Sequence, residues 1–251
     1  MFRGLVTAFR TLTIVPVPGQ DAEQFSDSLS WFPVVGLILG LVEALLCFLI
    51  ARTGWFELAA VAGVLAGVVL TRGMHLDGFA DLVDGFWGGR DRESRLRIMK
   101  DPHVGSFGSI ALSMLLLGKW VVLHRLVLVG GFTVLAAAVL LARQVQVFLA
   151  VLMPYARPEG GIARDFVDGA IMSHLIVSSL LTALFLLSLF HFHPMLLLVL
   201  VPAAALTALG TGLLAQAKIG GITGDVLGAV SESAELVVML CGTWLYPVLT
   251  Q

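Results

Sequence analysis

The 251-residue sequence has few charged residues. Only 13% of its residues are charged, whereas 58% are hydrophobic, and the mean hydropathy is +0.97. Soluble domains are about half apolar and about one quarter charged. This composition excludes an ordinary soluble domain and identifies a membrane protein.

Cysteine is also scarce, and the net charge is only −2. Cys47 and Cys241 both fall within apolar segments, where a disulfide would require two helices to meet at one depth, so we expect buried thiols. The basic residues of the segment 90–100 alternate with acids, which is a poor pattern for nucleic-acid binding. We therefore expect no nucleic-acid partner.

Long apolar runs occupy most of the chain. A helix that crosses a bilayer needs about 20 mostly apolar residues. Seven windows approach this length, near 31–51, 58–72, 104–123, 126–151, 174–191, 194–215 and 226–249, of which the second is the shortest. The intervening segments are too short to form another core. We expect an all-α, polytopic membrane helical bundle of about seven transmembrane helices with short cytoplasmic interfacial helices, in one domain over residues 1–251.

The Lys and Arg residues are distributed unevenly among the predicted loops. Loops rich in these residues remain in the cytoplasm. If the N-terminus lies inside, the outer side carries three of them, Arg52, Lys119 and Arg125. The inner side carries eleven: Arg3, Arg10, Arg72, Arg90, Arg92, Arg95, Arg97, Lys100, Arg157, Arg164 and Lys218. The long loops rich in Gly and acid also lie inside, so we expect the functional site at the cytoplasmic face.

The densest group of acids lies in "TRGMHLDGFADLVDGFWGG", which ends an apolar segment. In a helix, Asp77, Asp81 and Asp84 would fall within about 60° of arc. Their mutual repulsion requires a cation, and Mg²⁺ prefers carboxylates and phosphate oxygens as ligands. We predict a Mg²⁺ and diphosphate site; the alternative is a solvated, polar helix end. His75 is either a general base, a phosphate contact or an interfacial histidine.

The segment "GRDRESRLRIMKDPHVGSFGS" follows directly. Phosphates bind where cations meet the N-terminus of a helix. Arg97 and Lys100 are therefore candidate phosphate ligands, and Gly105 and Gly108 open the next span. Asp101 is a further candidate for the general base.

A second group of acids, Asp225, Glu232 and Glu235, falls within about 80° of arc on one helix face. Glu232 and Glu235 lie inside a predicted span, where acids are costly and function is the default hypothesis. Glu235 is a third candidate base.

Two more features accompany these acids. Arg143 lies within the span 126–151, where it could pair with the acids or with substrate phosphate; a purely structural ion pair is the alternative. The segment "KIGGITGDVLGA", which contains Gly224, is rich in glycine, and flexible backbone N–H groups of this kind can surround a phosphate.

Four blocks occur in order: "HLDGFADLVDG" at 75–85, "RIMKDPHVGSFG" at 97–108, "ARPEGG" at 156–161 and "GGITGDVLGAVSESAEL" at 220–236. Together they resemble the cobalamin synthase family, the adenosylcobinamide-GDP ribazoletransferases of the bacterial cytoplasmic membrane. The resemblance implies attack of the ribose 3′-hydroxyl of α-ribazole, or of its 5′-phosphate, on the cobinamide-bearing phosphorus of adenosylcobinamide-GDP. The products are adenosylcobalamin, or its 5′-phosphate, and GMP.

With that reaction in view, the candidate residues take three roles. We expect Mg²⁺ at Asp77, Asp81, Asp84, Asp225 and Glu232. We expect substrate contacts from Arg97, Lys100, Gly105, Gly108, Arg143 and Gly224, and a general base among His75, Asp101 and Glu235. Membrane lipid is an expected partner, and assembly as a homo-oligomer or with other enzymes that build the nucleotide loop stays open.

Three other functions use residues of these types. Intramembrane prenyltransferases and alcohol phosphotransferases also use Asp-rich segments with Mg²⁺, but "LDGFADLVDG" fits neither usual pattern. An ion-coupled transporter could use Glu232, Glu235 and Arg143 as a relay, but most spans are uniformly apolar. The sequence favours the transferase.

Overall fold

The structure is a computed structural model that describes residues 2–157, 159–161 and 163–249. Pro158 of the "ARPEGG" block lies outside the described residues. The helices in chain order are α1 (Phe2–Leu12), η1 (Phe25–Trp31), α2 (Phe32–Ala51), α3 (Phe56–Leu70), α4 (Met74–Gly88), α5 (Arg92–Ile98), α6 (Ser106–Leu128), α7 (Phe132–Leu152), α8 (Arg164–Asp168), α9 (Met172–Leu189), η2 (Pro194–Leu196), α10 (Leu197–Ile219) and α11 (Gly224–Leu249).

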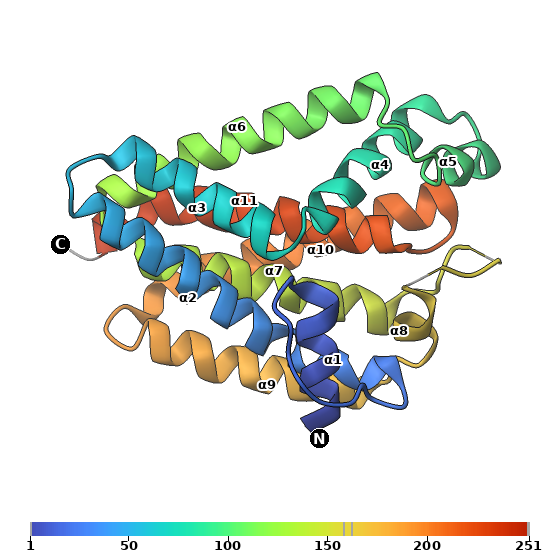
Figure 1. Ribbon diagram of the computed structural model, residues 1–251, viewed down its shortest axis with the longest axis horizontal. Helices are drawn as coiled ribbons and strands as arrows, with labels where there is room; N and C mark the ends of the chain where they lie inside the picture. Colours follow the sequence, from blue (N-terminus) through green and yellow to red (C-terminus); the bar gives the residue numbers. More distant parts are fainter. Residues whose placement is uncertain (1, 158, 162, 250–251) are drawn as a thin grey trace.

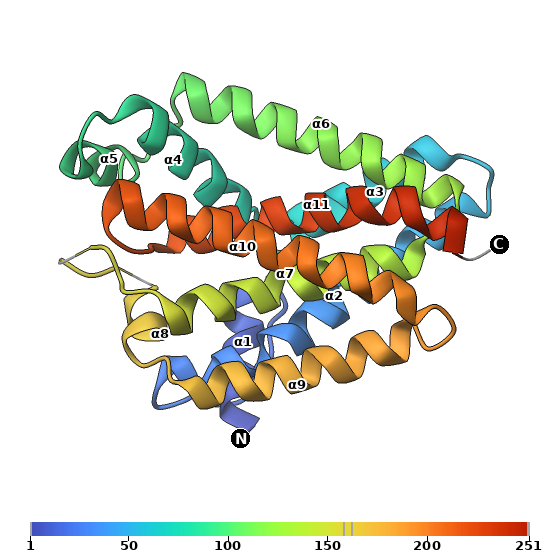
Figure 2. The same ribbon diagram turned by 180° about the vertical axis from the view of Figure 1, so that it is seen from behind.

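The expectation of an all-α, polytopic membrane bundle is confirmed. Six helical segments in the described residues are long and apolar enough to cross a membrane: Phe25–Ala51, Ser106–Leu128, Phe132–Leu152, Met172–Leu189, Pro194–Ile219 and Gly224–Tyr246. They run back and forth along the long axis of the molecule (Figures 1 and 2).

The second predicted span is different. Helix α3 has 15 residues, too few for a full crossing, and it meets α4 at a bend of 87°, so the pair is either one broken span or a re-entrant segment. The bend arises at Arg72 and Gly73, which both adopt left-handed backbone conformations, with φ of 56° and 66°. A helix cannot continue through such residues. The Arg72 guanidinium donates hydrogen bonds to the carbonyls of Arg10 and Thr13, which hold the turn.

Helix α7 forms the centre of the bundle, with α2 and α11 packed against it (Figures 1 and 2). Its apolar window is 83% buried, the largest share among the six spans in the described chain. Small residues permit the close packing: a Cβ atom on Gly40 of α2 would lie 2.8 Å from the Cα atom of Ala136. Small residues at such contacts let membrane helices approach closely.

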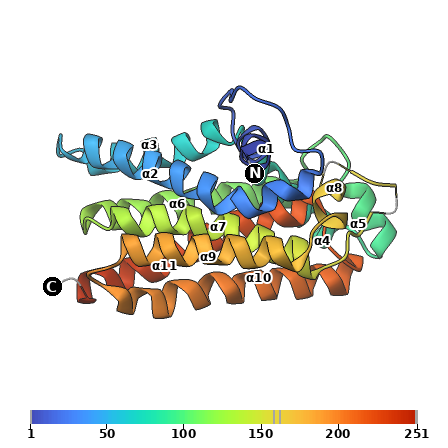
Figure 3. The same ribbon diagram turned by 90° about the horizontal axis from the view of Figure 1, so that it is seen from below.

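One end of the bundle carries the short helices. Helices α4, α5 and α8 lie there, whereas α11 ends at the opposite side (Figure 3). Arg92 of α5 donates hydrogen bonds to the carbonyls of Ile219 (2.7 Å) and Ala156 (2.6 Å). Helix α5 is thereby fastened to the end of α10 and to the loop after α7, so the loops at this end form one connected layer.

Candidate active site

A cavity of about 390 Å³ lies between α4, α7 and α11 on the one hand and α1, η1, the start of α2 and α8 on the other. Its lining includes His75 and Asp77 of α4, Gln146 of α7, Arg157 of the following loop and Asp225 of α11. Clefts of about 300–1,000 Å³ with a few convergent polar groups are the usual form of small-molecule sites. This cavity is therefore the candidate site.

Glycines bring the acids of α4 and α11 together. A Cβ atom on Gly78 would lie 2.9 Å from the Cα atom of Asp225, and one on Gly228 would lie 3.0 Å from the carbonyl oxygen of His75. Only hydrogen fits at these two crossings, so the two backbones touch. As a result, Asp77 and Asp225 line the same cavity, although 148 positions separate them in the sequence, the difference between their residue numbers.

Asp81 lies one turn beyond Asp77 on α4. Asp77, Asp225 and Asp84 are all close enough to repel a charge on Asp81. The acids of α4 therefore lie near one another, and Asp225 of α11 lies near them.

Arg157 compensates part of this negative charge. Its Nη2 atom donates to Asp225 Oδ2 at 2.6 Å and to the Met99 carbonyl at 3.2 Å. Thr223 donates a further hydrogen bond to the same Asp225 oxygen. Of the Lys and Arg residues in the described chain, Arg157 is the one that lines the cavity. Arg157 was predicted only as a basic loop residue and not as a site residue, although it lies inside the "ARPEGG" block.

His75 is buried, with 2% of its surface exposed, and neither ring nitrogen has a hydrogen-bond partner among the described residues. A buried polar group without a partner costs about 1–3 kcal/mol, which a bound ligand can recover.

Tyr155 also lines the cavity, and burial raises the pKa of its phenol, so it stays protonated at neutral pH.

The residues present fit Mg²⁺ in one specific way. In the described residues, no group of three or more His, Cys, Asp or Glu side chains is arranged to hold a metal ion alone. Mg²⁺, however, usually keeps several water ligands and uses about one or two protein carboxylates together with substrate phosphates. Asp77 and Asp225 in the cavity, with Asp81 beside them, provide this kind of incomplete site.

Asp84 makes contacts that the sequence did not predict. It is buried, and its two carboxylate oxygens accept hydrogen bonds from the backbone N–H groups of Gly105 (2.7 Å) and Gly108 (2.8 Å). An anion does bind at the N-terminus of α6, as expected for a helix dipole. The group bound there is the side chain of Asp84. It accepts hydrogen bonds from the N–H groups of Gly105 and Gly108, the two residues that were predicted as phosphate contacts.

The remaining candidates of the "RIMKDPHVGSFG" block lie outside the cavity lining. Lys100 forms an ion pair with Glu159 at 2.5 Å, and Arg97 is exposed. Asp101 is exposed, and hydrogen bonds from the backbone N–H and the ring of His103 lower the pKa of its carboxyl group. A carboxylate with a lowered pKa is a weak base.

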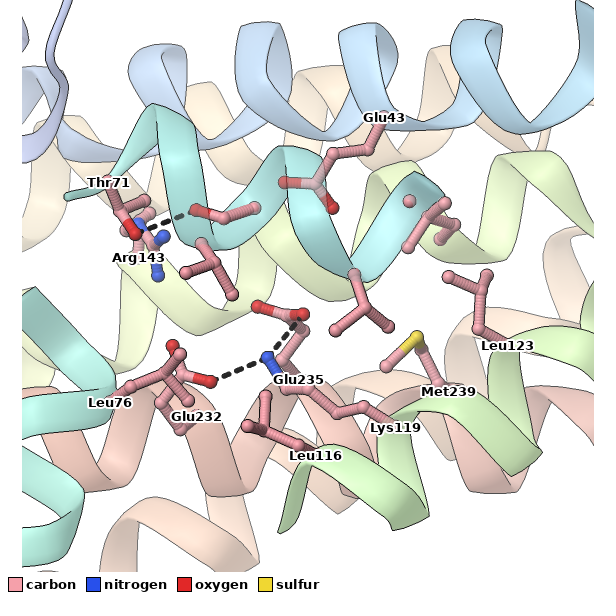
Figure 4. A pocket seen from close by; sticks show the side chains of 15 residues that line it. Glu43, Thr71, Leu76, Leu116, Lys119, Leu123, Arg143, Glu232, Glu235 and Met239 are labelled. Carbon is pink, nitrogen blue, oxygen red and sulfur yellow. Dashed lines mark hydrogen bonds and ion pairs between the residues drawn. The ribbon is translucent and has the colours of Figure 1, made fainter. Parts of the chain in front are cut away.

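Glu232 and Glu235 belong to a separate, buried group of ions (Figure 4). Lys119 of α6 lies between them, with Nζ 2.6 Å from Glu232 and 2.7 Å from Glu235. Glu43 of α2 lines the same small internal space. The sequence placed Lys119 at an outer span end, which is wrong, because its side chain is 8% exposed and lies among the helices.

Arg143 is also part of this group and is buried. Its Nη1 atom donates a hydrogen bond to Ser231 Oγ, while Lys119 makes the ion pairs to the glutamates. Among the described residues, the hydrogen-bond partner of Arg143 is thus a serine of α11 and not an acid of that helix. Gly224, by contrast, lines the cavity as part of the N-terminus of α11.

The structure is therefore a membrane helical bundle with a cavity that is lined by polar and charged side chains. Residues 4–243 match the cobalamin-5-phosphate synthase family. The chain belongs to this family, and the resemblance inferred from the four blocks is confirmed.

The similar proteins cover the chain from end to end. An adenosylcobinamide-GDP ribazoletransferase of Pelodictyon phaeoclathratiforme is 57% identical over 244 residues, which make up 96% of both chains. Those of Chlorobium phaeobacteroides and Syntrophobacter fumaroxidans are 56% and 37% identical, over 97% and 98% of this chain and 98% and 95% of their own. No solved structure matches.

Proposed function

We propose that this protein is an adenosylcobinamide-GDP ribazoletransferase. A ribose hydroxyl of α-ribazole, or of its 5′-phosphate, attacks the cobinamide-bearing phosphorus, the bond to the GMP oxygen breaks, and GMP leaves. Full-length relatives with this name support the proposal. The observation that carries it is the cavity in which carboxylates of α4 and α11 lie beside Arg157 and His75.

Asp77, Asp81 and Asp225 would hold Mg²⁺ against the diphosphate. Bound there, the ion would offset charge on the transferred phosphoryl group and on the departing GMP. Arg157 binds a phosphate oxygen, since guanidinium groups match phosphate geometry. Asp84 and Glu232 are left out of this set because the N-terminus of α6 and Lys119 engage them.

His75 accepts the proton of the attacking hydroxyl on one ring nitrogen. Of the three candidate bases it is the one that lines the cavity, and both of its nitrogens lack partners among the described residues. A general base must lie within hydrogen-bond reach of the proton that it removes. Asp101 and Glu235 do not satisfy this requirement, because they contact His103 and Lys119 instead.

The cavity opens toward the cytoplasm, with the N-terminus inside, in the bacterial inner membrane. The support is the uneven distribution of basic residues, which becomes eleven against two once the buried Lys119 is removed from the outer loops. Substrates that contain GDP are also found in the cytoplasm.

The reaction can be tested directly with purified protein. Protein in detergent is given adenosylcobinamide-GDP and α-ribazole, with Mg²⁺ or with a chelator, and cobalamin and GMP are measured by mass. We expect both products only with Mg²⁺. If neither product forms from α-ribazole or from its 5′-phosphate while substrates and protein are intact, the proposed function is wrong.

Asp81→Asn tests the metal-binding role. We expect turnover to fall by orders of magnitude, about 10²-fold or more, while the purified protein elutes as the wild type does. Asp165→Asn, which changes an exposed residue of helix α8, is the control and should leave turnover unchanged. Near-normal turnover of Asp81→Asn at saturating Mg²⁺ would remove Asp81 from the site.

The orientation can be tested by labelling. In a background with Cys47 and Cys241 replaced by serine, Arg90→Cys and Gly54→Cys place single thiols in loops at opposite ends of the bundle. A membrane-impermeant thiol reagent applied to spheroplasts should label the cysteine at position 54 and not that at position 90. The reverse pattern would contradict the cytoplasmic assignment.

A further inference from the structure

The cavity has two chemically different walls. Helices α4 and α11 supply the polar wall described above. The opposite wall comes from α1, η1, α2 and α8 and consists mainly of apolar side chains: Leu12, Leu29, Phe32 and Phe166. The rings of Phe32 and Phe166 lie 6.2 Å apart with an interplanar angle of 54°, and both side chains are buried. This wall suits a flat, uncharged aromatic group rather than a phosphate.

Gln146 contributes a fixed hydrogen-bond acceptor. Its Nε2 atom donates to the carbonyl of Leu227 at 3.1 Å. Because a carbonyl can only accept, this bond determines which end of the amide faces α11. The other atom, Oε1, has no partner among the described residues, and the residue is 3% exposed. Gln146 was not among the residues predicted from the sequence, because a single glutamine within an apolar helix belongs to no recognisable motif.

We propose that this cavity binds the acceptor nucleoside, with its aromatic base against the Phe32 and Phe166 wall and a ribose hydroxyl donating a hydrogen bond to Gln146 Oε1. The inference rests on the proposed function, since it assumes that the acceptor is a nucleoside. The hydroxyl contact places the ribose in the cavity that His75 also lines. Gln146 is then a specificity-determining residue, and Phe32 and Phe166 select an apolar base.

The size of the cavity supports this assignment. A volume of about 390 Å³ is near the lower end of the range for ligand sites, about 300–1,000 Å³, and suits one nucleoside. An adenosylated corrinoid joined to GDP is several times larger than a nucleoside, so only its diphosphate can reach the polar wall. The cavity therefore has room for the acceptor but not for the whole donor, and we expect the acceptor to bind in the absence of the donor.

The test compares two glutamines of the same helix. Gln146→Leu removes the proposed contact, whereas Gln144→Leu removes an amide whose hydrogen bonds go to Ser179 and Thr182 of α9, away from the cavity. KM is measured separately for α-ribazole and for adenosylcobinamide-GDP, and binding of α-ribazole alone is measured by calorimetry. We expect Gln146→Leu to raise the acceptor KM and Kd about tenfold, a factor typical of one lost hydrogen bond. The donor KM and all values for Gln144→Leu should change less than twofold.

Phe166→Leu provides an independent test, because it keeps an apolar contact while removing the ring. It should weaken binding of α-ribazole several-fold and leave the donor KM unchanged. The inference is overturned if both folded variants bind α-ribazole as the wild type does, or if donor and acceptor KM rise equally. In those cases wild-type production of cobalamin and GMP still supports the proposed function. If the wild type makes neither product, the proposed function fails and the inference fails with it.

Discussion

The buried ion pairs between Lys119 of α6 and two glutamates of α11 lead to a prediction about the stability of the protein. Lys119 forms ion pairs with Glu232 and Glu235 at 2.6 and 2.7 Å, and the three side chains are 8%, 6% and 10% exposed. Lys119→Met keeps the length and apolar stem of the side chain but removes its charge. Two carboxylates would then lie in a low-dielectric interior without their common partner (Figure 4).

The magnitude follows from this burial. Removal of one member of a buried ion pair costs about 3–5 kcal/mol, chiefly because the other charge is left uncompensated. For a chain of about 150–250 residues, each kcal/mol lowers Tm by about 2–4 °C. Lys119→Met should therefore lower Tm by roughly 6–20 °C. The triple variant Lys119→Met, Glu232→Gln, Glu235→Gln has no uncompensated carboxylate at these positions and should recover much of the loss.

The assay is thermal unfolding of the detergent-purified protein, followed by circular dichroism. Lys100→Met is the matched control: its ion pair with Glu159 is equally short, at 2.5 Å, but the two side chains are 45% and 53% exposed. Exposed pairs contribute little, so its Tm should change slightly. The reasoning is refuted if Lys119→Met and Lys100→Met have the same Tm, or if the triple variant is less stable than Lys119→Met.

Three further predictions concern the cavity and its supports. Arg157→Ala should lower turnover by roughly 10²–10³-fold, while the exposed Arg164→Ala should have little effect; equal rates would exclude a phosphate contact at Arg157. Asp84→Ala should lower stability by about 1–3 kcal/mol, because two N–H groups at the start of α6 lose their acceptor; unchanged unfolding would contradict the capping function. Gly78→Ala should lower turnover roughly 100-fold for a helix displacement of about 1 Å, whereas Gly210→Ala, with no atom within 4 Å of its added methyl, should be neutral in the same assay.

Features that depend on local sequence were predictable. Apolar runs located the spans, and the spacing of Asp77, Asp81 and Asp84 indicated the helix that became α4. The exception was the second span, predicted over 58–72, because hydropathy did not indicate the sharp turn at Arg72 and Gly73 that joins it to the next helix. Hydropathy averages over a window and does not register the left-handed backbone of two consecutive residues, so the bend of 87° was not predictable in this way.

Features that depend on contacts between distant segments were only partly predictable. Lys119 lies near the end of an apolar window, and its partners Glu232 and Glu235 follow 113 and 116 positions later, by difference of residue numbers. A count of the basic residues in predicted loops assigns such a lysine to the outer side, because the count contains no information on how deep a side chain lies within the bundle. Arg157 and Gln146 were missed for a related reason. Arg157 contacts Asp225 and Gln146 contacts Leu227, and both partners belong to α11, which is distant in the sequence and comes close only in the folded chain.

The glycines show how one sequence feature can have several physical causes. Sequence analysis interpreted Gly105, Gly108 and Gly224 as phosphate contacts, but the first two leave space for Asp84, since a Cβ atom on Gly105 would lie 2.5 Å from its Oδ1 atom. Gly78 and Gly228 instead let α4 and α11 touch. That contact brings Asp77 and Asp225 to one cavity, and Asp84 anchors α4 to the start of α6. In the proposed site, the acid cluster therefore combines two functions on one helix: Asp84 fixes the position of α4, and this position would present Asp77 and Asp81 to the substrate.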